Sequence, residues 1–175
     1  MRVFGLVGRS CSGKTTLLEK LLPCLRARGL RVSTMKHAHH GFDLDRPGKD
    51  SHRHRDAGAG EVMVVSDEGW ALMAETPNVA EPDVESLLAR MAPVDLVLIE
   101  GFHTHPHPKI EVHRPAHGRD LIWRPGGDVV AVVCDAPPSA VDAPVLDLND
   151  PEAIADFIFA RLVPASPAPP EAATA

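Results

Sequence analysis

The sequence has no tyrosine, only two tryptophans and five phenylalanines, and just three cysteines among its 175 residues. Three widely spaced cysteines do not make a disulfide framework, so we expect reduced thiols and a cytoplasmic protein. No apolar run is long enough to span a bilayer, and the short N-terminal one leads into a glycine loop, unlike a signal peptide. The net charge of −6 argues against a general nucleic-acid binder, which would present a basic face.

The stretch GRSCSGKTT, residues 8–16, matches the P-loop pattern G-x-x-x-x-G-K-[ST]. Its glycines permit backbone conformations that turn successive N–H groups inward as an anion-binding nest, and the next helix presents its positive end to the same anion. The alternative is a chance match in a glycine turn, but a strand precedes the loop and a helix follows, as the mechanism requires. Lys14 is placed to reach the β- and γ-phosphates, and the Thr15 hydroxyl to ligate Mg²⁺. The predicted phosphate-binding residues are Gly8, Ser12, Gly13, Lys14, Thr15 and Thr16.

Strands alternate with helices along the chain, which predicts an α/β three-layer fold with a mostly parallel central sheet flanked by helices. The predicted strands are 3–7, 30–35, 61–65, 70–74, 95–99, 109–113, 129–134 and 145–148. The predicted helices are 15–28, 51–57 with Ser51 as N-cap, 81–91 entered through Pro82, and 151–162 capped by Asp150. We expect residues 1–163 to form one nucleotide-binding domain and the Pro/Ala-rich residues 164–175 to be a disordered tail.

A P-loop needs a second carboxylate near Mg²⁺, usually where an apolar strand ends. The run DLVLIEG, residues 95–101, places Glu100 there, so Lys14 and Glu100 are the predicted catalytic residues. Glu is longer than the more common Asp, which suggests contact with Mg²⁺ through water or contact with a nucleophilic water. The alternative is a solvated acid at a strand end.

Two further regions offer carboxylates. The long polar loop after the second strand contains Asp45 and Asp50, which are available as Mg²⁺ ligands, although any single acid there can equally be solvated. Asp135 ends the apolar run VVAVVCD. An acid at this point can accept hydrogen bonds from guanine N1 and N2, or it can be a turn residue ahead of Pro137.

Ten histidines are many for this length, and three of them alternate in HTHPHP, residues 103–108. Histidine is a common metal ligand, but no Cys-x-x-Cys accompanies the run. We therefore expect an exposed loop here rather than a physiological metal site.

Four stretches together resemble the molybdopterin-guanine dinucleotide biosynthesis protein B family, MobB. They are GRSCSGKTTLLEKLL, TMKHAHHGFDLDRPGKDSHRHRDAGA, WALMAETP, and DLVLIEGFH with PKIEVHR. The second is the most specific, because the P-loop and the Glu-Gly strand occur in many NTPases. The resemblance covers residues 2–135, with weaker likeness to Leu162. The histidine run departs from the lysine-containing loop expected after Glu-Gly-Phe.

The resemblance implies a P-loop GTPase of the SIMIBI type that binds GTP and Mg²⁺, hydrolyses GTP weakly and often forms a homodimer. It implies a MobA-type guanylyltransferase as partner, which joins GMP to molybdopterin; whether molybdopterin itself binds here stays open. Asp45 and Asp50 fall in the signature loop and would line the same site as the P-loop and Glu100.

Two other functions remain compatible with the residues. A small-molecule kinase would use the P-loop for γ-phosphoryl transfer and would need an arginine-bearing lid. Candidates for such arginines are Arg53, Arg55, Arg114 and Arg119, although no lid segment is recognisable. A metallochaperone GTPase would use the histidines to carry nickel or zinc, and the histidine count is its only support.

Overall fold

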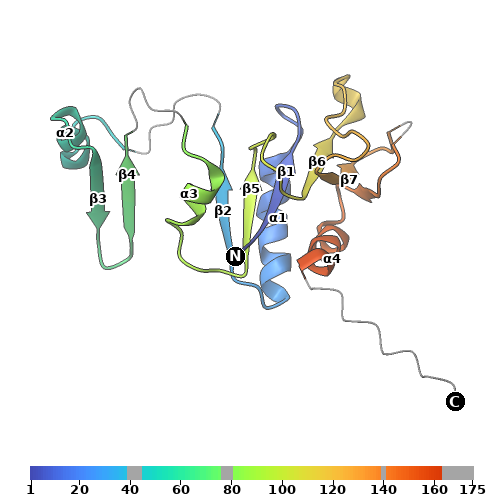
Figure 1. The fold of residues 1–175 in the computed structure, drawn as a ribbon, viewed down its shortest axis with the longest axis horizontal. Coiled ribbons are helices and arrows are strands. Elements are labelled where there is room, and N and C mark those ends of the chain that lie inside the picture. Colours follow the sequence, from blue (N-terminus) through green and yellow to red (C-terminus); the bar gives the residue numbers. More distant parts are fainter. Residues whose placement is uncertain (39–44, 76–80, 139–140, 163–175) are drawn as a thin grey trace, which may run out of the picture. The chain divides into compact units, whose positions relative to one another are not determined.

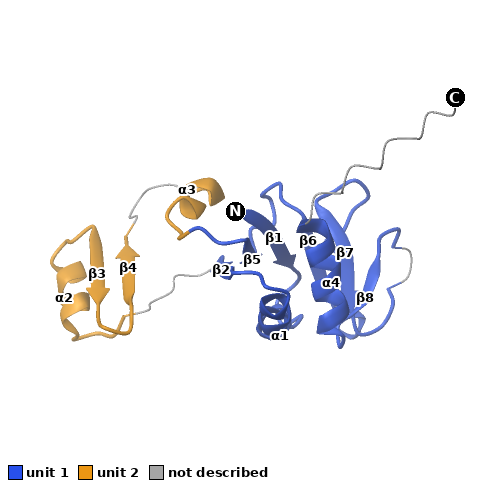
Figure 2. Ribbon diagram, turned by 90° about the horizontal axis from the view of Figure 1, so that it is seen from below, with its two compact units in different colours: residues 1–37, 93–175 blue, residues 38–92 orange. Residues whose placement is uncertain are grey.

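The computed structural model of the protein describes residues 1–38, 45–75, 81–138 and 141–162. The chain divides into two compact units (Figure 2). Unit 1 comprises residues 1–37 and 93–175, and unit 2 comprises residues 38–92. The predicted tail, 164–175, lies outside the described residues. Within the described ranges, no helix has the length and apolar character that a membrane crossing requires.

A six-stranded sheet with the order β2-β5-β1-β6-β7-β8 forms the centre of unit 1 (Figure 1). Every neighbouring pair in it is parallel. The strands are β1 (Arg2–Val7), β2 (Val32–Lys36), β5 (Leu96–Glu100), β6 (Lys109–His113), β7 (Val129–Cys134) and β8 (Val145–Asp147). The strands therefore all end at the same edge of the sheet, which carries the P-loop after β1. This confirms the predicted fold class of a mostly parallel sheet flanked by helices.

Two helices, α1 (Lys14–Ala27) and α4 (Pro151–Leu162), pack against the sheet and against each other. In α1 the leucines at 17, 21 and 25 are buried, as their helical spacing predicts. Alternate residues of the strands, such as Phe4 and Leu98, complete this core. Helix α4 begins as predicted, because the Asp150 carboxylate accepts a hydrogen bond from the Ala153 N–H at 3.0 Å.

The second strand begins two residues later than predicted. Leu30 was expected in it, but the Leu30 N–H bonds to the Leu25 carbonyl and so closes the end of α1. The strand β2 then extends to Lys36, one residue beyond the predicted end.

Connecting segments cover the opposite face of the sheet around β1 and β6. A Cβ added to Gly5 would lie 2.4 Å from Nε2 of His107, which is 4 % exposed. The Lys109 side chain, 1 % exposed, donates to the His105 carbonyl at 2.7 Å. The prediction of an exposed histidine loop is therefore wrong for His107, because the glycine in β1 leaves room for its ring and Lys109 binds the loop backbone.

Unit 2 contains a two-stranded antiparallel hairpin of β3 (Glu61–Val65) and β4 (Trp70–Ala74), with helices α2 (Asp50–Asp56) and α3 (Val84–Leu88). The two strands are those predicted. Both helices lie where they are predicted, but their starts differ. Ser51 is not the N-cap of α2, because Lys49 holds that position and Ser51 lies inside the helix, where its hydroxyl donates to Asp45. Helix α3 begins after Asp83, whose carboxylate accepts from the Ser86 N–H, so Pro82 lies outside a helix much shorter than predicted.

Candidate functional site

The P-loop joins β1 to α1, and its glycines are required by its geometry. Gly13 has φ = 97°, a conformation that residues with a Cβ rarely adopt. A Cβ on Gly8 would lie 2.4 Å from the Val112 carbonyl oxygen and 2.7 Å from the Ser12 hydroxyl oxygen. The loop thus sits tightly against β6. Ser12 is 3 % exposed, and its Oγ is buried without a hydrogen-bond partner in the part of the chain that the structure describes.

The Lys14 side chain lies over this loop. Its Nζ donates to the carbonyls of Gly8 and Arg9, at 2.9 and 3.0 Å. From this position the ammonium group is placed to meet a phosphate held by the loop N–H groups. Burial lowers the pKa of Lys14; the Glu100 carboxylate opposes this and the Lys36 ammonium adds to it.

A hydroxyl and a carboxylate meet beside the P-loop on the β5 side. Thr15 Oγ1 lies 3.1 and 3.2 Å from the two carboxylate oxygens of Glu100, which is 8 % exposed at the end of β5. Hard oxygen ligands of this kind suit Mg²⁺, which is usually held by one or two protein groups, waters and phosphates. The donor set therefore fits the ion, whose chemistry would be to neutralise charge on the β- and γ-phosphates.

Lys36, at the end of β2, is a member of this cluster that the sequence did not identify. Its Nζ lies 3.5 Å from Glu100 Oε1, and its side chain is 61 % exposed. Strand β2 pairs with β5, which sets Lys36 opposite Glu100. That pairing, however, joins residues that are far apart in the chain.

On the β6 side, Arg114 connects the P-loop to the end of β7. Its Nε donates to the Ser12 carbonyl at 3.1 Å, and its Nη1 donates to Asp135 at 2.5 Å. Because C=O and N–H point in opposite directions across a trans peptide, this bond turns the Gly13 N–H away from Arg114. Asp135, the predicted base-reading acid, is thus paired with an arginine at the strand edge, and base recognition by it stays a prediction.

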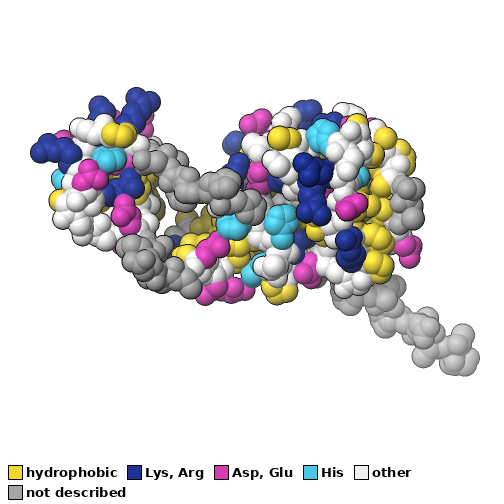
Figure 3. Space-filling model, turned by 90° about the horizontal axis from the view of Figure 1, so that it is seen from above, with side chains coloured by type: hydrophobic (Ala, Val, Ile, Leu, Met, Phe, Trp, Pro, Cys, Tyr) yellow, Lys and Arg dark blue, Asp and Glu magenta, His cyan; other side chains and the backbone are white. Residues whose placement is uncertain are grey.

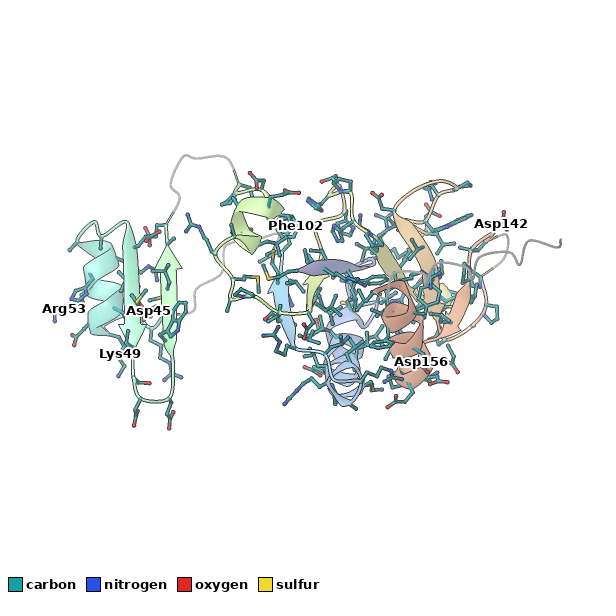
Figure 4. The ribbon with its side chains drawn as sticks, turned by 60° about the horizontal axis from the view of Figure 1, so that its bottom comes forward. Asp45, Lys49, Arg53, Phe102, Asp142 and Asp156 are labelled. Atoms are coloured by element: carbon teal, nitrogen blue, oxygen red, sulfur yellow. The ribbon has the colours of Figure 1, made fainter. Side chains whose placement is uncertain are left out.

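The two loop acids predicted as metal ligands belong to unit 2. Asp45, labelled in Figure 4 near α2, accepts from the Ser51 hydroxyl at 2.9 Å and from the Arg46 N–H at 2.8 Å. Asp50 Oδ1 lies 3.7 Å from Arg53 Nη1. Their predicted contact with the P-loop metal stays a prediction. Among the described residues, no group of three or more His, Cys, Asp or Glu could hold a metal ion.

Comparison with known proteins gives a consistent set of relatives. Residues 3–135 match the family described as molybdopterin guanine dinucleotide synthesis protein B, MobB. A molybdopterin-guanine dinucleotide biosynthesis adapter protein of Escherichia coli is 45 % identical over 154 residues, which cover 85 % of this chain and 86 % of that protein. The adapter protein of Haemophilus influenzae is 45 % identical over 157 residues, covering 89 % and 86 %. The crystal structure of a MobB homolog from Bacillus stearothermophilus superposes with a TM-score of 0.67 at 28 % identity, covering 93 % of this chain and 98 % of the other.

Proposed function

Because the chain belongs to the MobB family of molybdopterin guanine dinucleotide synthesis proteins, we propose that it is an adapter in molybdenum cofactor biosynthesis. It assists the attachment of GMP to molybdopterin, the step that forms molybdopterin guanine dinucleotide. The partner is a MobA-type guanylyltransferase, and the setting is the cytoplasm. The observation that carries the proposal is the match of the adapter proteins to most of this chain together with a P-loop whose geometry suits a nucleotide.

The nucleotide in this proposal is GTP with Mg²⁺. The P-loop N–H groups and Lys14 bind the phosphates, and Thr15 and Glu100 bind the metal directly or through water. The support for this assignment is the Thr15–Glu100 pair at 3.1 Å beside a lysine that already lies over the loop. Guanine is the favoured base because the reaction that the adapter serves transfers GMP.

A homodimer is the favoured assembly, and the hairpin of unit 2 supports it. Val65 and Trp70 are directly paired across the hairpin, and they are 68 % and 67 % exposed. Met63, Val64 and Leu72 of the same hairpin are exposed as well. Adjacent apolar residues exposed on both strands are typical of an interface. Trp70→Ser should shift the protein toward monomer in analytical ultracentrifugation, whereas Val145→Ser, at an exposed valine of unit 1, should not.

The adapter role is tested by reconstitution with a purified MobA-type guanylyltransferase, molybdopterin and Mg·GTP. Wild-type protein should increase the rate at which the dinucleotide forms. The Lys14→Ala variant should increase it much less, because it lacks the cation that faces the phosphates. If the wild-type chain leaves the rate unchanged over a range of enzyme concentrations, the adapter role is contradicted.

A further inference from the structure

A cationic pocket adjoins the P-loop on its β6 side, opposite the Thr15–Glu100 pair. It is lined by Arg9, Ser12, Val112, His113, Arg114, His117 and Arg119. Figure 3, which looks down on the molecule from above the view of Figure 1, shows Lys and Arg side chains gathered beside histidines on unit 1. No Asp or Glu is among the described residues that line the pocket. We propose that this pocket binds a phosphate group of a second ligand, distinct from the nucleotide phosphates in the P-loop.

The chemistry of the lining favours an anion over a neutral base or sugar. Guanidinium groups carry only hydrogen-bond donors, in a planar fork that matches phosphate oxygens. The buried Ser12 Oγ, which has no hydrogen-bond partner among the described residues, provides one more donor at the pocket wall. A purine or ribose offers few acceptors to so many donors, so a phosphomonoester satisfies the lining better.

The pocket wall is held in place before any ligand binds. The buried Glu111 carboxylate accepts from the N–H groups of Ile122 and Trp123 at 2.8 and 2.7 Å, which ties the connector after β6 to the sheet. Arg9 Nε donates to the Asp120 carbonyl at 3.4 Å. A short 3₁₀ helix, Pro115–His117, lies in the connector between the end of β6 and Asp120. A backbone that is already ordered in this way loses little conformational entropy when a ligand binds.

Arg114 gives the two phosphate sites a shared wall. It lines the pocket and also holds the Ser12 carbonyl of the P-loop. A phosphate in the pocket would therefore lie next to the nucleotide phosphates. This placement suits an adapter that brings a phosphorylated compound and a nucleotide together, and in this it rests on the proposed function. Phosphate binding in the pocket does not itself depend on the adapter role.

The test is a titration of ¹⁵N-labelled protein with inorganic phosphate, followed by NMR, with Mg²⁺ and a non-hydrolysable GTP analogue already bound. Amide signals of His117, Gly118 and Arg119 report the pocket, and those of Gly8 and Gly13 report the P-loop. We expect phosphate to shift the pocket signals saturably while the P-loop signals stay in their nucleotide-bound positions. Arg119→Ala should weaken this phosphate affinity about tenfold, and Arg26→Ala, at an exposed arginine of α1, should leave it unchanged.

Two results would overturn the inference. In one, phosphate shifts no pocket signals once the nucleotide is bound, because the nucleotide itself occupies the pocket. In the other, the pocket signals respond equally in wild type and in Arg119→Ala, as for an adventitious ion only. If the GTP analogue fails to bind, the same titration is made with Lys14→Ala protein, whose P-loop site is weakened. Its signals then report phosphate binding in the pocket alone. Failure of the nucleotide assignment is thus distinguished from failure of the pocket.

Discussion

Unit 1 buries the residues of its central strands, whereas unit 2 leaves its hairpin exposed. All five residues of β5 and all five of β6 are buried. In the described part of unit 2, only Val62 and Val84 are buried. Burial in unit 1 holds the ends of the strands, and with them Glu100 and the P-loop, in fixed positions. Exposed apolar residues in unit 2 need another surface to cover them. A candidate binding site on a buried sheet in one unit and an exposed apolar hairpin in the other suit a protein that works through partners.

The largest effect is expected when one leucine is replaced in each unit and the losses of stability are compared. Leu98→Ala in β5 removes a side chain that is 0 % exposed, and it should destabilise the protein by roughly 2–5 kcal/mol. Leu72→Ala in β4, at a side chain 39 % exposed, should cost less than about 1 kcal/mol. Urea unfolding of both variants measures the difference. Equal losses would mean that the hairpin is packed as tightly as the sheet.

Substitution of the P-loop lysine should separate binding from stability within unit 1. Lys14→Ala should weaken Mg·GTP binding by about a hundredfold without lowering the melting temperature, because the fold disfavours this charge. The Lys14 pKa lies below its ordinary value of 10.5, so the folded state binds fewer protons than the unfolded chain. Wild-type stability relative to Lys14→Ala should therefore rise as the pH increases through the lowered pKa toward 10.5.

Calorimetry and thermal unfolding from pH 7 to 10 measure both effects of Lys14→Ala. Unchanged nucleotide affinity in this variant would contradict the assignment of Lys14 as a phosphate-binding residue.

A smaller effect is expected at the metal side of the site. Glu100→Gln keeps the shape of the side chain but removes its charge. The increase in GTP affinity that Mg²⁺ produces should therefore be about tenfold smaller in this variant. Nucleotide affinity measured in EDTA should change much less. An Mg²⁺ titration identical to that of wild type would count against Glu100 as a metal-site residue.

The smallest effect is expected at the start of β5, where the Arg31 guanidinium and N–H hold the pKa of the Asp95 carboxyl below 3.8. A lowered carboxyl pKa adds stability that is present above the unfolded value and is lost as the pH falls through the folded value. Asp95→Asn should lower the melting temperature by no more than about 2 °C at pH 7, and the difference should shrink as the pH falls below 3.8. A difference that grows on acidification would contradict the pairing.

The sequence predicted those parts of the molecule that depend on local patterns. The P-loop, the position of Glu100 and the four strands at 61–65, 70–74, 109–113 and 129–134 follow from glycine spacing and apolar runs. What it did not predict depends on contacts between distant residues. Arg114 bonds to Ser12 across 102 positions, which no local pattern reveals.

His107 is a case where a signal existed but was not used. Its ring packs on Gly5, and a glycine inside a buried strand marks a close approach by another segment. In helix α3 the proline pattern is misleading, because Pro82 predicts the helix start but the capping side chain is that of the next residue, Asp83.

The central claim is that this P-loop holds Mg·GTP. The most direct test is calorimetric titration of the protein with GTP and with ATP, each with and without Mg²⁺. We expect the protein to prefer GTP, with an affinity that Mg²⁺ increases and that Glu100→Gln reduces. Equal affinities, or preference for ATP, would contradict this claim and would favour a P-loop kinase, in which Arg114 and Arg119 beside the loop would contact the phosphates of a second substrate.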